Sequence, residues 1–409
     1  MRVRPLAAAA ASCALLMSVP ATTSITGAAA APPECNVKIG SPARQAEQAG
    51  EPWEHKRLNV RQVWPITDGS GVLVAVIDSG FNNEGTQLSQ IHLRLPGVNV
   101  SGVFGPNDVR DCFYHGTAVT GIIAAPRVDG VFFTGVAPGV TILPIKEQQD
   151  ENQKDTGRLA EAVKAAVAAG ARVINISITE PNGTPDLEQA IAAAARANIV
   201  VVAAGGNDGQ NTNQAAYPAA YSTQYPNVLA VSMTDRADTV SGVSTHGNYI
   251  NIAAPGSGVE VAMPKNTYAP NQDGTSFASP VVAGTAALVR AAHPKLTAAA
   301  VVSRIEATAD APPGVTVPSA SYGYGIVNPY LAVTAVRNDA AVSPAPPTPQ
   351  AVKAVPPPPP ASRHLQHLAL GVSVALLGLA VLAGLIAAIV RRGTWFGGMH
   401  APAPPSVGE

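Results

Sequence analysis

Charged side chains are scarce in this sequence. Asp, Glu, Lys and Arg make up 13% of its 409 residues, and the formal net charge is −1. An average soluble domain has about a quarter of its residues charged. Because no block of basic residues occurs, the sequence offers no electrostatic basis for binding nucleic acid.

Metal ligands in a recognisable pattern are also lacking. The eight histidines include no HExxH spacing. Scattered loop acids such as Asp150 and Glu151 do not define a calcium site. We therefore expect neither a metal ion nor another cofactor.

Cysteine is rare, with three residues in the whole chain. Cys13 lies in an amino-terminal segment that has two early arginines, the apolar run LAAAAASCALLM and a small-residue stretch ending in TGAAAA. This layout is typical of a secretory signal peptide, which we place over 1–31; a core helix is the less favoured interpretation. In the exported chain the other two cysteines, Cys35 and Cys112, are expected to form a disulfide bond, with two buried free thiols as the alternative.

One long apolar run is present near the carboxyl end. Residues 368–390 contain no charge and are long enough, at about 1.5 Å per helical residue, to cross a bilayer core of roughly 30 Å. Arg391 and Arg392 follow directly, so the positive-inside rule places the tail, 391–409, in the cytoplasm. The sequence predicts a single-pass protein of the cell membrane whose globular part is extracytoplasmic.

The rest of the chain divides into three parts. Residues 339–364 are rich in proline, which favours a stiff polyproline II spacer between the globular part and the membrane. Residues 72–338 are long enough for one large domain, preceded by an extension over 32–71.

Apolar strand-like runs alternate with helical stretches through this domain. The runs VLVAVID, TILPIK, RVINISI, IVVVAAGG, VLAVSMT and YINIAAPG are typical of buried parallel strands, and HGTAVTGIIAA and LAEAVKAAVAA are typical of helices. Gly170 and Pro294 mark two helix ends. The predicted fold class is α/β, a parallel sheet flanked by helices, in which functional residues gather at the carboxyl ends of strands.

Three polar residues stand at such places. Asp78 ends VLVAVID, His115 opens a small-residue helix, and Ser276 begins another long apolar helix after Gly274. Each has an ordinary structural interpretation: a turn aspartate, a helix-start histidine, and a helix N-cap formed by Ser276 or Thr275. A helix start also favours negative charge developing beside the serine hydroxyl.

The three segments together resemble the signatures of subtilisin-like serine proteases. DSG at Asp78, HGTAVTGIIA from His115 and GTSFASPVVAG around Ser276 occur in the subtilase order Asp, His, Ser. The resemblance implies that Ser276 attacks the peptide carbonyl, that His115 transfers its proton, and that Asp78 orients the imidazole. It also implies that the Asn207 side-chain amide and the Ser276 N–H form an oxyanion hole, although an asparagine in a Gly-rich turn is common without that role.

The same resemblance indicates where substrate binds. Thr179 stands where the family usually has glycine, so we expect either a narrowed pocket or altered strand pairing with the substrate, and in both cases selective cleavage. The segments similar to those that line the family's first substrate pocket contain Ser177, Ile178, Thr179, Ala204, Gly205 and Gly206.

Signal, protease domain, proline-rich spacer and carboxy-terminal membrane helix together resemble the mycosins, membrane-anchored subtilases of type VII secretion systems. Mycosins retain an amino-terminal extension that wraps the catalytic domain. Only about 45 residues lie between the predicted cleavage point and Asp78, too few for a folded inhibitory pro-domain as well as the first mature segment. A bond between Cys35 and Cys112 would then pin the extension beside His115.

Two functions follow from the resemblance. The first is an extracytoplasmic serine endopeptidase that processes proteins exported by a type VII system, with protein or peptide substrates and the secretion membrane components as partners. The second is a mainly structural component of the secretion complex whose proteolysis is dispensable. A carboxylic-ester hydrolase is disfavoured because GTSFASP is not the GxSxG elbow of that class.

Overall fold

The computed structural model describes residues 44–45, 51–148 and 156–339, with Gly378 and Gly384. The chain divides into two units, Met1–Pro347 and Thr348–Glu409, and the folded part belongs to the first. No helix within the described residues is long and apolar enough to cross a membrane. The predicted membrane helix over 368–390 lies outside those residues apart from the two glycines, as does the predicted signal peptide.

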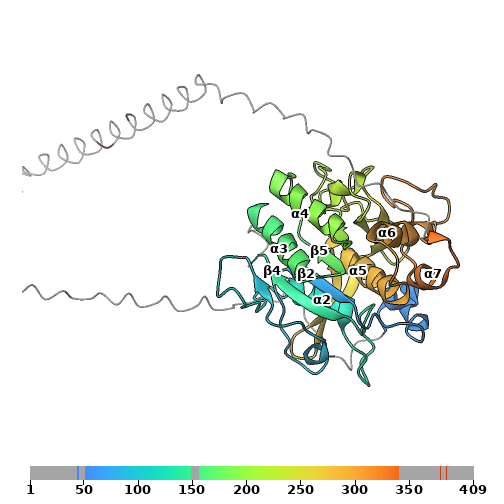
Figure 1. The fold of residues 1–409 in the computed structure, drawn as a ribbon, viewed down its shortest axis with the longest axis horizontal. Coiled ribbons are helices and arrows are strands. Elements are labelled where there is room, and N and C mark those ends of the chain that lie inside the picture. The colour runs from blue at the N-terminus through green and yellow to red at the C-terminus, as the bar shows by residue number, and fades with distance from the viewer. Residues whose placement is uncertain (1–43, 46–50, 149–155, 340–377, 379–383, 385–409) are drawn as a thin grey trace, which may run out of the picture. The chain divides into compact units, whose positions relative to one another are not determined.

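A seven-stranded parallel sheet forms the centre of the folded part (Figure 1). Apart from the half-buried edge strand Val98–Asn99, its strands are short runs rich in Val, Ile and Ala that are almost completely buried, as expected for a sheet covered on both faces. The α/β prediction is therefore confirmed. In spatial order the strands are β3 (Val98–Asn99), β4 (Thr141–Lys146), β2 (Leu73–Asp78), β5 (Val173–Ile176), β6 (Val200–Ala204), β7 (Val228–Thr234) and β8 (Ile252–Pro255).

Alternation of side chains along the strands creates two cores. In β2, Val74 and Val76 point into a core shared with helices α2 (His115–Ala124), α5 (Thr275–Ala292) and α6 (Ala298–Ala307). Ala75 and Ile77 point into a second core with α3 (Thr156–Ala168) and α4 (Pro185–Arg196). Because successive strand residues face opposite sides, one apolar run holds both helical layers.

Helix ends agree with the local sequence signals. Gly170 has φ +74° just after α3, a conformation that glycine adopts without steric cost. Thr184 and Thr297 cap α4 and α6 through their side chains, and α5 ends two residues before Pro294. Other short helical segments are η2 (Val60–Gln62), η3 (Leu88–Gln90), η4 (Ala219–Thr223) and α7 (Pro329–Thr334).

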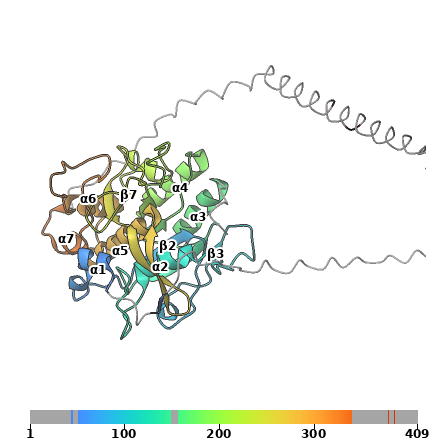
Figure 2. The same ribbon diagram turned by 180° about the vertical axis from the view of Figure 1, so that it is seen from behind.

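A smaller antiparallel sheet joins the amino-terminal extension to the domain. Its order is β1 (Arg44–Gln45), β10 (Thr267–Asp273) and β9 (Ser257–Met263). The extension continues in α1 (Trp53–Leu58), which with η2 lies beside α7 in both views (Figures 1 and 2).

Polar contacts hold α1 in place. The Trp53 Nε1–H donates to the Gly258 carbonyl at 3.0 Å, and Arg57 donates to both Asp238 and Asp310. The described part of the extension is thus an integral part of the folded unit.

Candidate active site

The site is assembled from three separate elements. Asp78 is the last residue of β2, His115 is the first of α2, and Ser276 is the second of α5. The carboxyl end of β2 lies at the sheet edge where α2 begins, which is where a parallel sheet places functional residues. The fold therefore brings together three residues that are far apart in the chain.

Hydrogen bonds connect the three side chains in one line. His115 Nδ1 lies 2.7 Å from Asp78 Oδ1, and His115 Nε2 lies 2.9 Å from Ser276 Oγ. Since a carboxylate can only accept, Nδ1 carries the proton, and Nε2 accepts from the serine hydroxyl. This is the arrangement of nucleophile, general base and orienting carboxylate.

Burial differs along this line in a way that suits the chemistry. The Asp78 side chain is 0% exposed, whereas that of His115 is 18% exposed. Asp78 Oδ1 also accepts from the Ser79 N–H at 2.7 Å, which partly compensates for removing the carboxylate from water. The aspartate is screened from solvent, and the histidine remains accessible to substrate.

Two aromatic rings flank the imidazole. The Phe113 ring is stacked on it with centroids 6.1 Å apart, and the Phe277 ring is tilted against it at 5.2 Å. These contacts restrict rotation of the His115 ring about its side-chain bonds. Neither phenylalanine is distinguished by its sequence pattern, although each lies within two residues of a triad member.

Asn207 lies three residues after the end of β6, and its side chain contacts the start of α5. Its Oδ1 accepts from the Thr275 N–H at 2.9 Å and from the Thr275 hydroxyl at 3.0 Å. With Oδ1 held in this way, the amide group Nδ2 faces the other direction, and no described residue accepts from it. The predicted oxyanion donor therefore lies beside the helix start that carries the nucleophile.

Gly274 leaves space beside the hydroxyl of Ser276. A Cβ at Gly274 would lie 2.8 Å from Ser276 Oγ, closer than real Cβ contacts allow. The positive end of the α5 dipole is at the same place, where it favours negative charge on a substrate oxygen. Thr275, the alternative N-cap, makes no such cap, because Gly274 is the N-cap residue and has no side chain.

The predicted pocket residues lie after the neighbouring strands β5 and β6. The Ser177 hydroxyl donates to the Ser276 carbonyl at 3.0 Å and contacts Ser279 Oγ at 3.0 Å, so this side chain holds the start of α5. Ile178 and Thr179 are half-buried. The role of these residues in binding substrate stays a prediction.

Gly205 and Gly206, which belong to the second predicted pocket segment, make hydrogen bonds that hold the fold. The Gly205 N–H donates to Val231 O, and the Gly206 N–H donates to Thr275 Oγ1 at 3.1 Å. Ala204, Gly205 and Gly206 are all buried. Their lining of a substrate pocket likewise stays a prediction.

Cys112 is disulfide-bonded. Cys35 lies outside the described residues, so its pairing with Cys112 stays a prediction. No group of three or more His, Cys, Asp or Glu that could hold a metal ion occurs in the part of the chain that the structure describes.

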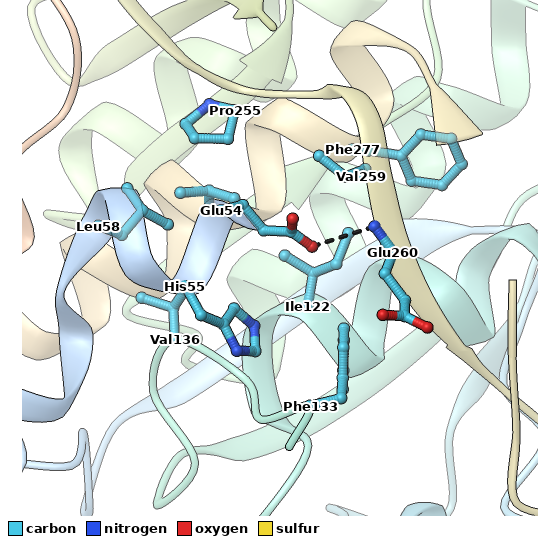
Figure 3. Close-up of a pocket in the computed structure, with 11 residues that line it drawn as sticks. Glu54, His55, Leu58, Ile122, Phe133, Val136, Pro255, Val259, Glu260 and Phe277 are labelled. Atoms are coloured by element: carbon cyan, nitrogen blue, oxygen red, sulfur yellow. Dashed lines mark hydrogen bonds between the residues drawn. The ribbon is translucent and has the colours of Figure 1, made fainter. Parts of the chain in front are cut away.

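A small cavity lies between the extension and the domain (Figure 3). It measures about 10 Å³ and is lined by Phe277, whose ring also contacts His115. Glu54 of α1 points into it and accepts from the Glu260 N–H at 3.0 Å. Burial raises the pKa of Glu54 to about 7, and burial lowers the pKa of the neighbouring His55 to about 4.

Comparisons with known proteins agree with this geometry. The family model Peptidase_S8, the subtilase family, matches residues 69–325. The chain is 34% identical over 281 residues to thermitase of Thermoactinomyces vulgaris, an alignment that covers 68% of this chain and 94% of thermitase. It is 36% identical over 296 residues to Mycosin-4 of Mycobacterium tuberculosis, covering 62% of this chain and 63% of Mycosin-4.

Solved structures give the same grouping. MycP1 from Mycobacterium smegmatis superposes with a TM-score of 0.64 at 27% identity, over 78% of this chain and 93% of that one. A second structure, described as a serine protease MycP1 that is an essential component of the type VII (ESX-1) secretion system, has a TM-score of 0.60 at 28% identity. That match covers 75% of this chain and 97% of the MycP1 chain.

Proposed function

This chain belongs to the subtilase family of serine proteases, and from that premise we propose that it is a membrane-anchored, extracytoplasmic endopeptidase of a type VII secretion system. Its substrates are proteins exported by that system. The observation that carries the proposal is the continuous line of hydrogen bonds from Asp78 through His115 to Ser276.

The geometry supports a specific reaction. Ser276 Oγ attacks the peptide carbonyl while His115 Nε2 takes the hydroxyl proton and later delivers it to the leaving amine. Asp78 holds the His115 imidazole in the tautomer that carries the proton on Nδ1, and it stabilises the imidazolium that forms. Asn207 Nδ2 and the Ser276 N–H donate to the oxyanion of the tetrahedral intermediate; loss of one such donor costs about 3 to 4 kcal/mol in the transition state. Water then hydrolyses the acyl-enzyme by the same steps in reverse.

Similarity to the mycosins supports the place of action. The matched MycP1 chains are covered over 93% or more of their length, and two of them are described as belonging to a type VII secretion system. The uncharged run over 368–390 supplies the proposed anchor, with the catalytic domain outside and the 391–409 tail in the cytoplasm.

Stabilisation of the secretion membrane complex is a second proposed role. It rests on the proposed anchor, which would hold the domain at the secretion membrane whether or not it cleaves anything. The alternative function is therefore a mainly structural component with dispensable proteolysis.

The test replaces Ser276 with Ala in the native host and follows two readouts in the same cells, processing of exported proteins and their export. We expect processing to stop, since a methyl group cannot attack a carbonyl, while the protein remains at its normal level. If export continues, the protease also serves as a physical component of the machine. If export stops as well, cleavage itself is required and the structural alternative is excluded. Unchanged processing would overturn the protease assignment.

A further inference from the structure

A second buried carboxylate lies next to the triad without being part of it. Asp111 is 1% exposed, four residues before His115. Its Oδ1 accepts from the Ser79 hydroxyl at 2.9 Å and from the N–H groups of Phe113 and Tyr114 at 3.0 and 2.7 Å. Its Oδ2 accepts from the Thr117 N–H at 2.8 Å and the Thr117 hydroxyl at 2.7 Å. Both oxygens are thus fully used.

These donors belong to the start of α2, the helix that carries His115. Tyr114 is the N-cap residue, yet its side chain makes no capping bond. Asp111 takes over that task, because it accepts from the backbone N–H groups of Tyr114 and Thr117 that the helix itself leaves unpaired. The histidine therefore begins a helix whose first turn is held by a side chain from outside it.

The backbone at this point is strained. Tyr114 has φ +65°, a left-handed conformation that costs a non-glycine residue free energy. Such a residue persists only where surrounding contacts determine it, and these outliers cluster at active sites. The 2.7 Å bond from the Tyr114 N–H to Asp111 is the contact that holds it, one residue before the catalytic base.

The same carboxylate is linked to the catalytic aspartate. Ser79 follows Asp78, and its hydroxyl donates to Asp111 while accepting from the Gly116 N–H at 2.9 Å. The two backbones also touch, because a Cβ at Gly116 would lie 2.3 Å from the Gly80 carbonyl oxygen. Ser79 therefore connects the turn after Asp78 to the residue after His115.

Lys146 closes the network from the neighbouring strand. It pairs with Asp78 in the β2–β4 register and donates to the carbonyls of Ser79 at 2.6 Å and Arg110 at 3.1 Å. The pKa of Lys146 is lowered, because the effect of burial outweighs the opposite effect of the carboxylates of Asp111, Asp108 and Asp78. Through its two hydrogen bonds the ammonium group joins the turn after Asp78 to the segment just before Asp111.

We propose that Asp111, acting through Ser79 and the first turn of α2, is a positioning residue that sets the Asp78–His115 hydrogen bond. It does not touch the reacting atoms. It determines how the histidine ring is presented to Asp78 and Ser276, and a displacement of about 1 Å at such a point can cost about 100-fold in rate.

The test uses the purified full-length chain and a fluorophosphonate, which phosphonylates an activated serine and requires no knowledge of peptide specificity. The Asp111→Asn variant keeps the size of the side chain but presents an NH₂ group to the Thr117 N–H. We expect its second-order labelling rate at Ser276 to fall about 10- to 100-fold. The acid limb of its pH–rate profile should move to lower pH, because a weakened Asp78–His115 bond and the lost Asp111 charge both disfavour the imidazolium.

A matched control separates positioning from stability. Thr297→Ala removes the side-chain cap of α6, which accepts from the Ala300 N–H, and α6 carries no triad residue. The proposal is overturned if the labelling rates of Asp111→Asn and Thr297→Ala differ by less than twofold and the acid limb of the Asp111→Asn pH–rate profile is unchanged. Asp111 would then serve stability alone.

A second pair of variants keeps the test decisive should Asp111→Asn fail to fold. Ser79→Ala removes the link to Asp78 but leaves four donors on Asp111, and Ser79→Thr restores a hydroxyl. Slow labelling of Ser79→Ala that Ser79→Thr rescues supports the proposal. Equal labelling of Ser79→Ala and the unmodified chain contradicts it.

Discussion

Single residues at this site often serve the fold and the reaction together. The hydroxyl of Ser177, a predicted pocket residue, is hydrogen-bonded to the Ser276 carbonyl and to Ser279 Oγ. The amide oxygen of Asn207 accepts hydrogen bonds from Thr275, and its NH₂ group faces away from Thr275. A loss of activity on substitution must therefore be separated from a loss of local structure, and paired substitutions allow that.

For Asn207 the pair is Ala and Asp. Asn207→Ala removes both the oxyanion donor and the acceptor for Thr275, so we expect kcat to fall about 100- to 1,000-fold with little change in KM. Asn207→Asp keeps an acceptor for Thr275 and lacks the NH₂ donor, so its kcat should fall at least as far. Steady-state kinetics on a peptide substrate measure both. Near-normal activity of the Asp variant would mean that Asn207 only holds the start of α5.

At the scale of elements, α1 carries a buried carboxyl group into the contact between the extension and the domain. Glu54 lies at the cavity behind Phe277, 5% exposed, and its Oε2 has no hydrogen-bond partner among the described residues. The carboxylate of Glu260, on β9, accepts a hydrogen bond from Arg44 of β1. Besides the Arg57 contacts with Asp238 and Asp310, the extension thus meets the domain through two further carboxylates and Arg44, and this contact should respond to pH.

The sign follows from the pKa of Glu54. Burial raises that pKa from 4.5 to about 7, so the folded state favours the neutral carboxyl. This stabilisation is fully present below about pH 4.5 and is lost as the pH rises to about 7. His55 acts in the opposite sense, because its pKa is lowered from 6.5 to about 4 and its contribution is lost as the pH falls through that range.

We therefore expect Glu54→Gln to stabilise the protein at pH 8 by up to roughly 3 kcal/mol relative to the unmodified chain, and by little at pH 4.5. Denaturant unfolding at both pH values measures the difference. Glu306, whose pKa burial also raises to about 7, is present in both proteins and cancels in the comparison.

The control for this variant is Glu51→Gln, the same chemical change in the same extension. Glu51 pairs with Arg61 near the surface, where an ion pair contributes little, so we expect a small and pH-independent effect. A Glu54→Gln effect of equal size at both pH values would contradict the assignment of the buried carboxyl as the pH-dependent group.

At the scale of the whole molecule, the predicted disulfide joins the extension to the loop before His115. Cys35→Ser and Cys112→Ser should each lower the free energy of unfolding by roughly 4 kcal/mol in the chain-entropy model, because the bond closes a long loop. The double variant should lose no more than either single one. Thermal unfolding measures the loss, and mass spectrometry of the non-reduced chain counts free thiols. Additive losses, or a free thiol at Cys35 in the unmodified protein, would exclude the pairing.

Much of the architecture was predictable because the signals are local. Continuous Val and Ile runs such as LVAVID specify buried parallel strands, and Gly170 and Pro294 end helices through their own backbone chemistry. The three catalytic segments were recognisable because each requires small residues around one reactive group, as Gly274 beside Ser276 illustrates. The sequence by itself therefore determined the fold class and predicted the nucleophile, the base and the orienting acid, three residues whose side chains the structure joins by hydrogen bonds.

Tertiary structure decided how those residues are held. Asp111, Lys146 and Phe277 look like ordinary loop, strand and helix residues in the chain, and only the packing of β2, β4, α2 and α5 places them against His115 or the segments next to Asp78 and His115. Glu54 reads as a surface acid at the start of a helix until β9 covers it. The physical reason is that burial, hydrogen-bond partners and pKa depend on neighbours distant in the sequence, whereas strand runs, helix ends and reactive side chains are properties of short segments.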